Sequence, residues 1–153
     1  MTIPVGQEYM SPVLGLGKIA SYQNYKADTL AASSDINFGA AVQMVSDNPE
    51  QCKAYDGSGE FYGVAIAKHF VPSFEGDKVG KYSQFEAVSV LRQGIITVKV
   101  EEDVIKGEKA VIDKATANFR PSGTSTTEVS GVVGIFKTSA SGGGLAQLEI
   151  NLP

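Results

Sequence analysis

Residues 88–100 have the sequence VSVLRQGIITVKV, and this stretch decides the fold class. In its second half every other side chain is apolar and would share one face: Ile96, Val98 and Val100. A period of two is typical of a strand that buries one face. Arg92-Gln93-Gly94 divides the stretch, and we expect a tight hairpin there. The stretch therefore predicts two antiparallel strands.

Short apolar runs continue on both sides of this stretch, with turn residues between them. The runs lie at residues 40–45, 61–67, 110–113, 132–137 and 145–152. In the last run Ala146, Leu148 and Ile150 alternate with polar residues, which again indicates one buried face. Short strands at this spacing are typical of all-β domains. We predict a single β-sandwich or jelly-roll-like barrel over residues 35–153. Residues 115–130 are rich in Thr and Ser, and we expect a long exposed loop or an irregular edge there.

Before Asp35 the apolar residues follow neither the helical nor the alternating period. We interpret residues 1–34 as an extended N-terminal arm, and such a length of chain can span about 100 Å. An arm can dock on another chain or fold back over its own domain, and the sequence leaves both open. The side chains expected at such an interface are Tyr9, Leu14, Leu16, Tyr22 and Tyr25. A chain without the residues before Asp35 is expected to stay folded.

Composition and charge exclude several classes of protein. A length of 153 residues corresponds to one domain, and a net charge of -4 disfavours a nucleic-acid partner. No apolar stretch approaches the roughly 20 residues of a membrane-spanning helix, so no membrane partner is expected. The first residues lack the features of a secretory signal, and we expect synthesis and folding in a cytoplasm.

Residues suited to catalysis or metal binding are scarce. His69 is the single histidine and Cys52 the single cysteine, which excludes a paired-histidine metal site and an intramolecular disulfide. No nucleophilic motif surrounds Cys52, and a catalytic role there requires a base from elsewhere in the fold. We therefore expect no enzyme activity, no catalytic or metal-binding residues and no cofactor.

Five segments occur in an order that resembles one known family. They are DINFGAAV at 35–42, YGVAIA at 62–67, the stretch at 88–98, KGEKAV at 106–111 and GLAQLEINLP at 144–153. In order and spacing they resemble the structural cement proteins of tailed bacteriophages, which decorate the capsid. The resemblance covers residues 35–153; the earlier residues match in general character alone, and residues 115–130 do not match.

The resemblance implies a protein of the virion that is not an enzyme. It would be assembled in the host cytoplasm, bind the outer surface of the phage head, bridge neighbouring copies of the major capsid protein and stabilise the capsid. A symmetric lattice repeats its sites, so self-association into a homo-dimer or homo-trimer is a further expectation.

Two other classes of function compete with this interpretation. A carbohydrate-binding or host-attachment module on the virion would stack sugars on aromatic side chains, and the absence of Trp counts against it. A small hydrolase would have to build its site on His69 or Cys52.

Overall fold

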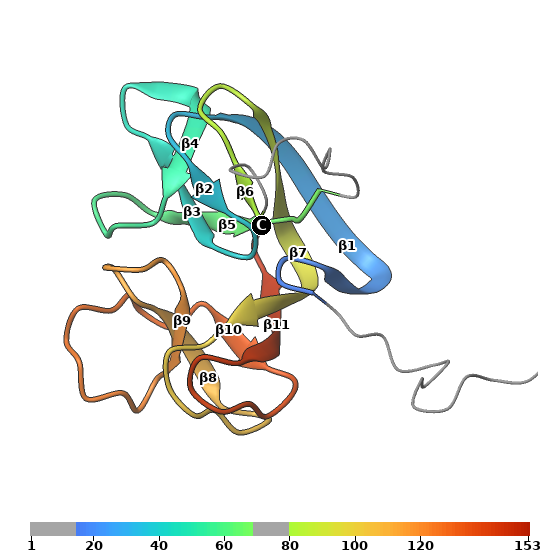
Figure 1. The fold of residues 1–153 in the computed structure, drawn as a ribbon, viewed down its shortest axis with the longest axis vertical. Coiled ribbons are helices and arrows are strands. Elements are labelled where there is room, and N and C mark those ends of the chain that lie inside the picture. Colours follow the sequence, from blue (N-terminus) through green and yellow to red (C-terminus); the bar gives the residue numbers. More distant parts are fainter. Residues whose placement is uncertain (1–14, 69–79) are drawn as a thin grey trace, which may run out of the picture.

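The computed structural model describes residues 15–68 and 80–153, and within these residues the chain forms strands and no helix (Figure 1). The strands are β1 (Ile19–Ala32), β2 (Ile36–Asn37), β3 (Ala41–Val45), β4 (Asn48–Ala54), β5 (Phe61–Ala65), β6 (Lys81–Tyr82), β7 (Ala87–Lys99), β8 (Lys109–Ile112), β9 (Phe119–Pro121), β10 (Gly134–Phe136) and β11 (Leu145–Asn151). Nine of them form one mixed sheet, while β2 and β6 pair with each other. The all-β class predicted from the sequence is confirmed.

β7 is one strand of 13 residues at the place where the sequence predicted a hairpin. Gly94 lies within it at φ 137°, a conformation that side-chain-bearing residues rarely adopt, and the strand bends there without reversing. β1 accompanies β7 on one side, from Ala31 opposite Ala87 to Ile19 opposite Ile96. The predicted hairpin is therefore wrong, because a glycine between two apolar runs is compatible with a bend as well as with a turn.

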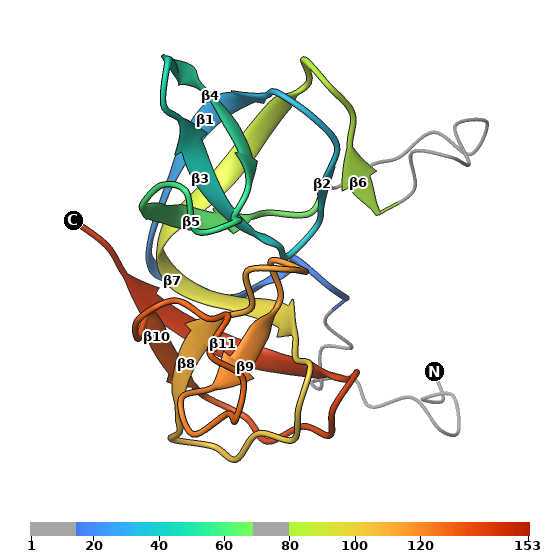
Figure 2. The same cartoon turned by 90° about the vertical axis from the view of Figure 1, so that its left-hand side faces the viewer.

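The first part of β7 completes a closed barrel, called the first barrel below (upper half of Figure 2). β1 pairs with β4 in parallel, followed by β3, β5 and β7, and β7 returns to β1. Gly63 in β5 allows this closure, because a Cβ at that position would lie 2.3 Å from the main-chain oxygen of Leu91 in β7. Of the two architectures that the sequence left open, this closure makes the unit a barrel.

The second part of β7 belongs to a second barrel, which also contains β11, β10, β8 and β9 (lower half of Figure 2). A parallel bridge between Val100 and Phe119 connects the last of these strands back to the end of β7. The amide N–H of Glu101 donates a hydrogen bond of 3.0 Å to the Phe119 oxygen at the same place. The second barrel is therefore closed by main-chain contacts at one end.

The predicted alternation is confirmed in β11, where Ala146, Leu148 and Ile150 are buried and their neighbours are not. In the second part of β7, Ile96 and Val98 are buried as predicted, and so is Val100 after it, but Thr97 on the opposite face is buried as well, at 3% exposed, so this strand does not alternate strictly.

Of the two alternatives predicted for residues 115–130, the irregular edge is found, because β9 lies there as the last strand in the order of the sheet. Ala117 and Phe119 are buried in the core. The surrounding polar residues concealed these two core positions.

One continuous apolar cluster joins the two barrels. β7 contributes to it on both sides of its bend, with Leu91 in the first barrel and Ile96 in the second, and both are fully buried. Because interiors are close-packed, a shared core makes the two barrels one rigid body.

β1 occupies most of the described part of the range that the sequence interpreted as an arm. It lies in the sheet of its own chain, so the sheet begins before the predicted boundary between residues 34 and 35. Residues 24–29 are all exposed, and main-chain pairing with β7 holds residues 26–29 in place. Such a strand shows no alternation in sequence. Residues 1–14 are outside the described part, and an arm there stays a prediction.

Candidate functional site

Two of the five predicted interface side chains can be placed. Leu16 is partly buried in the turn before β1 and packs against its own chain, since a Cβ at Gly39 would lie 2.6 Å from Leu16 Cδ1. Tyr25 is half exposed on β1, beside Gly94. Tyr9, Leu14 and the side chain of Tyr22 lie outside the described residues. No contact brings Leu16 and Tyr25 together within the described residues.

β1 bulges away from β7 beside the bend. Ser21 pairs with Ile95 and Lys26 with Gln93, so four residues of β1 stand opposite the single residue Gly94. Asn24 within the bulge has φ 55°, in the left-handed region that asparagine tolerates better than most residues. Bulges redirect strands and are frequent near functional sites. This bulge makes the junction of the two barrels a candidate site.

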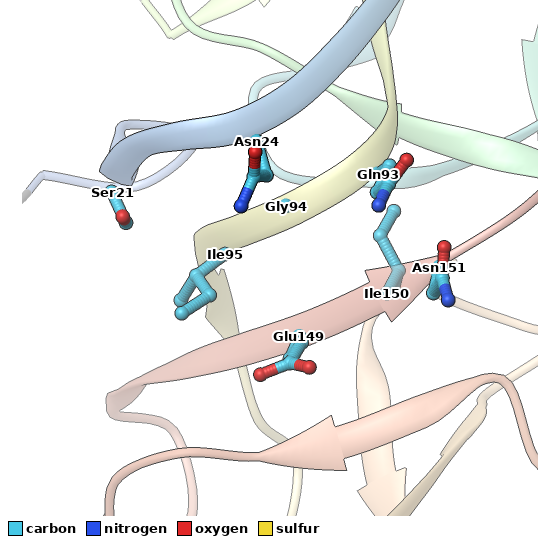
Figure 3. Close-up of a pocket in the computed structure, with 8 residues that line it drawn as sticks. All are labelled: Ser21, Asn24, Gln93, Gly94, Ile95, Glu149, Ile150 and Asn151. Carbon is cyan, nitrogen blue, oxygen red and sulfur yellow. The ribbon is translucent and has the colours of Figure 1, made fainter.

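The bulge borders a polar pocket of about 330 Å³ at this junction (Figure 3). Its lining comes from β1, β7 and β11: Ser21, Asn24, Gln93, Gly94, Ile95, Glu149, Ile150 and Asn151. The three amide side chains offer hydrogen-bond donors and acceptors, and Glu149 adds a carboxylate. These groups can bind polar atoms of another protein. In the sequence, Gly94 was the one residue that indicated a special main-chain conformation at this pocket, and we interpreted it as part of a turn.

Arg92 lines a second and more apolar pocket of about 470 Å³, with Met44, Glu60, Phe61, Tyr62, Leu152 and Pro153. Its guanidinium lies 4.1 Å from the centre of the Tyr62 ring, and Nη2 donates a hydrogen bond of 2.7 Å to the Pro153 oxygen. Tyr62 Oη donates to Asp28 Oδ2 at 2.7 Å, and this hydrogen bond, followed by burial, raises the pKa of Tyr62. The contacts hold β1, β5, β7 and the residues after β11 in one fixed surface.

A buried carboxylate anchors the turn after β8, which contacts the first barrel through a hydrogen bond of 2.9 Å from the Ala41 N–H to the Ala117 oxygen. Asp113 is 5% exposed and accepts hydrogen bonds from Arg120 Nε at 2.6 Å and from the Ala115 N–H at 2.8 Å. Burial alone would raise the pKa of Asp113, but the hydrogen bond from Arg120 and those from the main chain outweigh it and hold the pKa below its ordinary value. The carboxylate is therefore charged at neutral pH and stabilises the fold.

We expect Asp113→Asn to lower the free energy of unfolding at pH 7 by about 2 kcal/mol, since a hydrogen-bonded charge is lost from a buried site. The folded-state pKa is the lower one, so this contribution is complete above the unfolded-state pKa of about 4 and disappears as the pH falls through the folded-state value. Urea unfolding at pH 7, 4 and 3 measures the free energies of unfolding of the variant and the wild type, which should converge as the pH falls. A difference that does not change with pH would contradict the assignment. Glu149→Gln, at an exposed ion pair with Lys137, is the matched control and should change stability by less than about 1 kcal/mol.

Two kinds of reactive site, a metal centre and a nucleophilic cysteine, can be examined in the described residues. No group of three or more His, Cys, Asp or Glu in residues 15–68 and 80–153 is placed to hold a metal ion. Cys52 is fully buried, and burial raises the pKa of its thiol to about 11, so it is neither ionised nor accessible as a nucleophile. His69 lies outside the described part of the chain. The part of the chain that the structure describes contains no helix with the length and apolar character needed to cross a membrane.

Seven large apolar side chains in the described residues are exposed: Tyr25, Met44, Phe85, Ile105, Val132, Ile135 and Leu145. Ile135 stands between Lys109 and Glu149, so its partners on the two neighbouring strands are charged. Phe85 is the most exposed of them, at 72%. Sequence reasoning missed it, because a lone Phe beside Gln84 and Glu86 gives no sign of its exposure.

Comparison with known proteins yields one family, and the similar solved structures include two from bacteriophages. Residues 6–151 match the sequence profile of a family described as structural cement protein (E217 gp24/Pam3 gp6). The fold is similar to a chain in the structure of the capsid of Myoviridae phage XM1, with a TM-score of 0.75 and 13% identity over 99% of this chain and 98% of that chain. A lesser likeness, with a TM-score of 0.47 and 16% identity, is to the head fiber gp8.5 N base of bacteriophage phi29, over 83% of this chain and 94% of that one. No curated protein matches the sequence.

Proposed function

Because the chain belongs to the structural cement protein family of phages, we propose that it binds the outer surface of the assembled head and bridges neighbouring copies of the major capsid protein. The observation that carries the proposal is the family match, which extends over residues 6–151 and so includes both barrels. As a member of this family the chain is a structural component of the phage particle. Its proposed role is mechanical and involves no catalysis.

The rigidity of the two-barrel body supports a bridging role. A ligand that binds only the assembled lattice stabilises that lattice by mass action. A body with a shared core and a fixed surface around Arg92 loses little conformational freedom on binding, which favours affinity. The polar pocket at the barrel junction supplies hydrogen-bonding groups for such a contact.

Residues 1–14 are proposed to add a second point of attachment through Tyr9 and Leu14. A tethered second contact raises avidity through effective concentration, without a strong single site. Self-association into a dimer or trimer on the lattice is proposed together with this arrangement, because a symmetric shell presents each contact repeatedly.

The proposal is tested by adding the purified protein to heads of the same phage that lack it. We expect saturable co-sedimentation with the heads and a higher temperature of head disruption. At a free concentration of 100 times Kd, the linkage gain is about 2.7 kcal/mol per site. Unassembled major capsid protein is one control and should not bind the protein. Heads that already carry the protein are the other control and should not take up additional copies. If heads lacking the protein do not take it up, the cement function is rejected.

A further inference from the structure

Phe85 combines two unfavourable features in one residue. Its side chain is 72% exposed, and its main chain has φ 69°, in the left-handed region. The other non-glycine residues with positive φ in the described part are Asn24 and Ala117, a tolerant type and a small one. A bulky aromatic residue is rarely found in this region, and such strain persists where the surrounding structure imposes it.

The turn that carries Phe85 is held firmly on both sides. The Phe85 N–H donates a hydrogen bond of 2.7 Å to the Ala32 oxygen, and the Ala32 N–H donates one of 2.8 Å to the Glu86 oxygen. The Glu86 N–H donates to the Ser83 oxygen at 3.1 Å, and the Glu86 carboxylate pairs with Lys68. The backbone of the turn is therefore fixed by its neighbours, and the strain at Phe85 is not relieved by movement.

The fold of the chain itself does not account for a phenylalanine at this position. The segment between β6 and β7 passes over the end of the first barrel that is farthest from the second (Figure 2). Glycine or asparagine would adopt the same main-chain conformation with less strain. A rigid, exposed aromatic side chain is instead typical of the residues that dominate binding at protein interfaces, where a pocket of the partner removes it from water.

The charges on the segments around this turn indicate what kind of partner fits. Glu86 is paired with Lys68, and Lys81 Nζ lies 3.1 Å from Asp35 Oδ2. Both cations are therefore already neutralised, and the whole chain carries a net charge of -4. A nucleic acid or an anionic lipid surface would be attracted by unpaired cations. An exposed aromatic side chain next to neutralised pairs instead fits a concave apolar pocket in another protein.

We infer that Phe85 is the anchor residue by which the first barrel docks into an apolar pocket of the assembled capsid shell. The identity of this partner rests on the proposed cement function; the anchor itself follows from the exposure, the strain and the rigid support of the turn. The end of the first barrel is then the face turned toward the shell.

Phe85→Asn separates the anchor role from a structural role, because the two roles predict opposite signs for stability. Asparagine tolerates the left-handed conformation, so we expect the melting temperature of the free protein to rise by about 2–4 °C. Loss of an anchor should weaken binding to heads about 30-fold or more in the co-sedimentation titration. Phe85→Tyr keeps the ring and the strain, and it should bind and melt as the wild type does.

Other outcomes would overturn the anchor. Equal binding of Phe85→Asn and wild type would do so while leaving the cement function in place, because the wild type still binds. A lower melting temperature together with weaker binding would assign Phe85 a role in the fold. If the free Phe85→Asn variant has a different sedimentation coefficient from the free wild type, and both bind heads equally, the pocket that holds Phe85 belongs to a second copy of the chain. Failure of the wild type to bind would reject the cement function instead.

Discussion

Removal of residues 1–34 should abolish the cooperative fold, whereas removal of residues 1–14 should leave it intact. The longer deletion takes away β1, which pairs with both β4 and β7 and so opens the first barrel. It also removes Leu30 and Ala32 from the core. The shorter deletion leaves every described strand pairing in place. We expect a sigmoidal thermal transition for the chain starting at residue 15 and none for the chain starting at residue 35.

This pair of deletions replaces the expectation from sequence that a chain without residues 1–34 stays folded. It also isolates the proposed arm, since the shorter deletion removes Tyr9 and Leu14 without touching the sheet. If the arm supplies a second attachment, the shortened chain should bind heads at least 100-fold more weakly, which is the lower end of the gain from linked contacts. Unchanged binding would remove the arm from the mechanism, and a folded chain lacking residues 1–34 would contradict the role of β1.

Gly63→Ala should lower the free energy of unfolding by about 3 kcal/mol or more. A Cβ at this position would lie 2.3 Å from the Leu91 oxygen and 2.5 Å from Val90 Cγ1, so β5 and β7 would have to separate. Overpacking of a core costs typically 1–3 kcal/mol, and here one of the obstacles is main chain, which relaxes poorly. Thermal unfolding measures the loss, which corresponds to a melting temperature roughly 6–12 °C lower.

Gly123→Ala is the control for this substitution. Gly123 has no heavy atom within 4 Å of a built Cβ and no positive φ, so the change in stability should stay within about 0.5 kcal/mol. Equal losses at the two glycines would show that the close approach of β5 and β7 does not limit the fold. A loss at Gly63 alone would confirm that the first barrel depends on this contact.

The sequence predicted those strands whose side chains alternate between core and solvent. The run ending at Leu152 buries one face against the shared core, and the apolar face of the run ending at Val100 is buried as well; both apolar faces were visible beforehand. β4 was not predicted, because its residues Asn48–Ala54 are mostly polar and only Cys52 is fully buried. A strand held mainly by its neighbours' main chains leaves little trace in its own side chains.

The candidate site was less predictable than the fold, since it depends on contacts between distant segments. The polar pocket requires β1, β7 and β11 to meet at Gly94, and nothing local to Asn24 or Asn151 indicates that they share a surface. The strained main chain of Phe85 is likewise held by hydrogen bonds between its turn and Ala32, which lies far earlier in the sequence. Local sequence patterns do not report such distant pairing.

The order of the strands also sets when each barrel can form during synthesis. All strands of the first barrel lie before residue 100, so it can close before the last strand of the second barrel has left the ribosome. The second barrel has β11 between β7 and β10, and its sheet cannot be completed until residue 151 has left the ribosome. Until then, the second part of β7 lacks its pairing with β11. The first barrel, with the proposed anchor Phe85, therefore forms before the second barrel is complete.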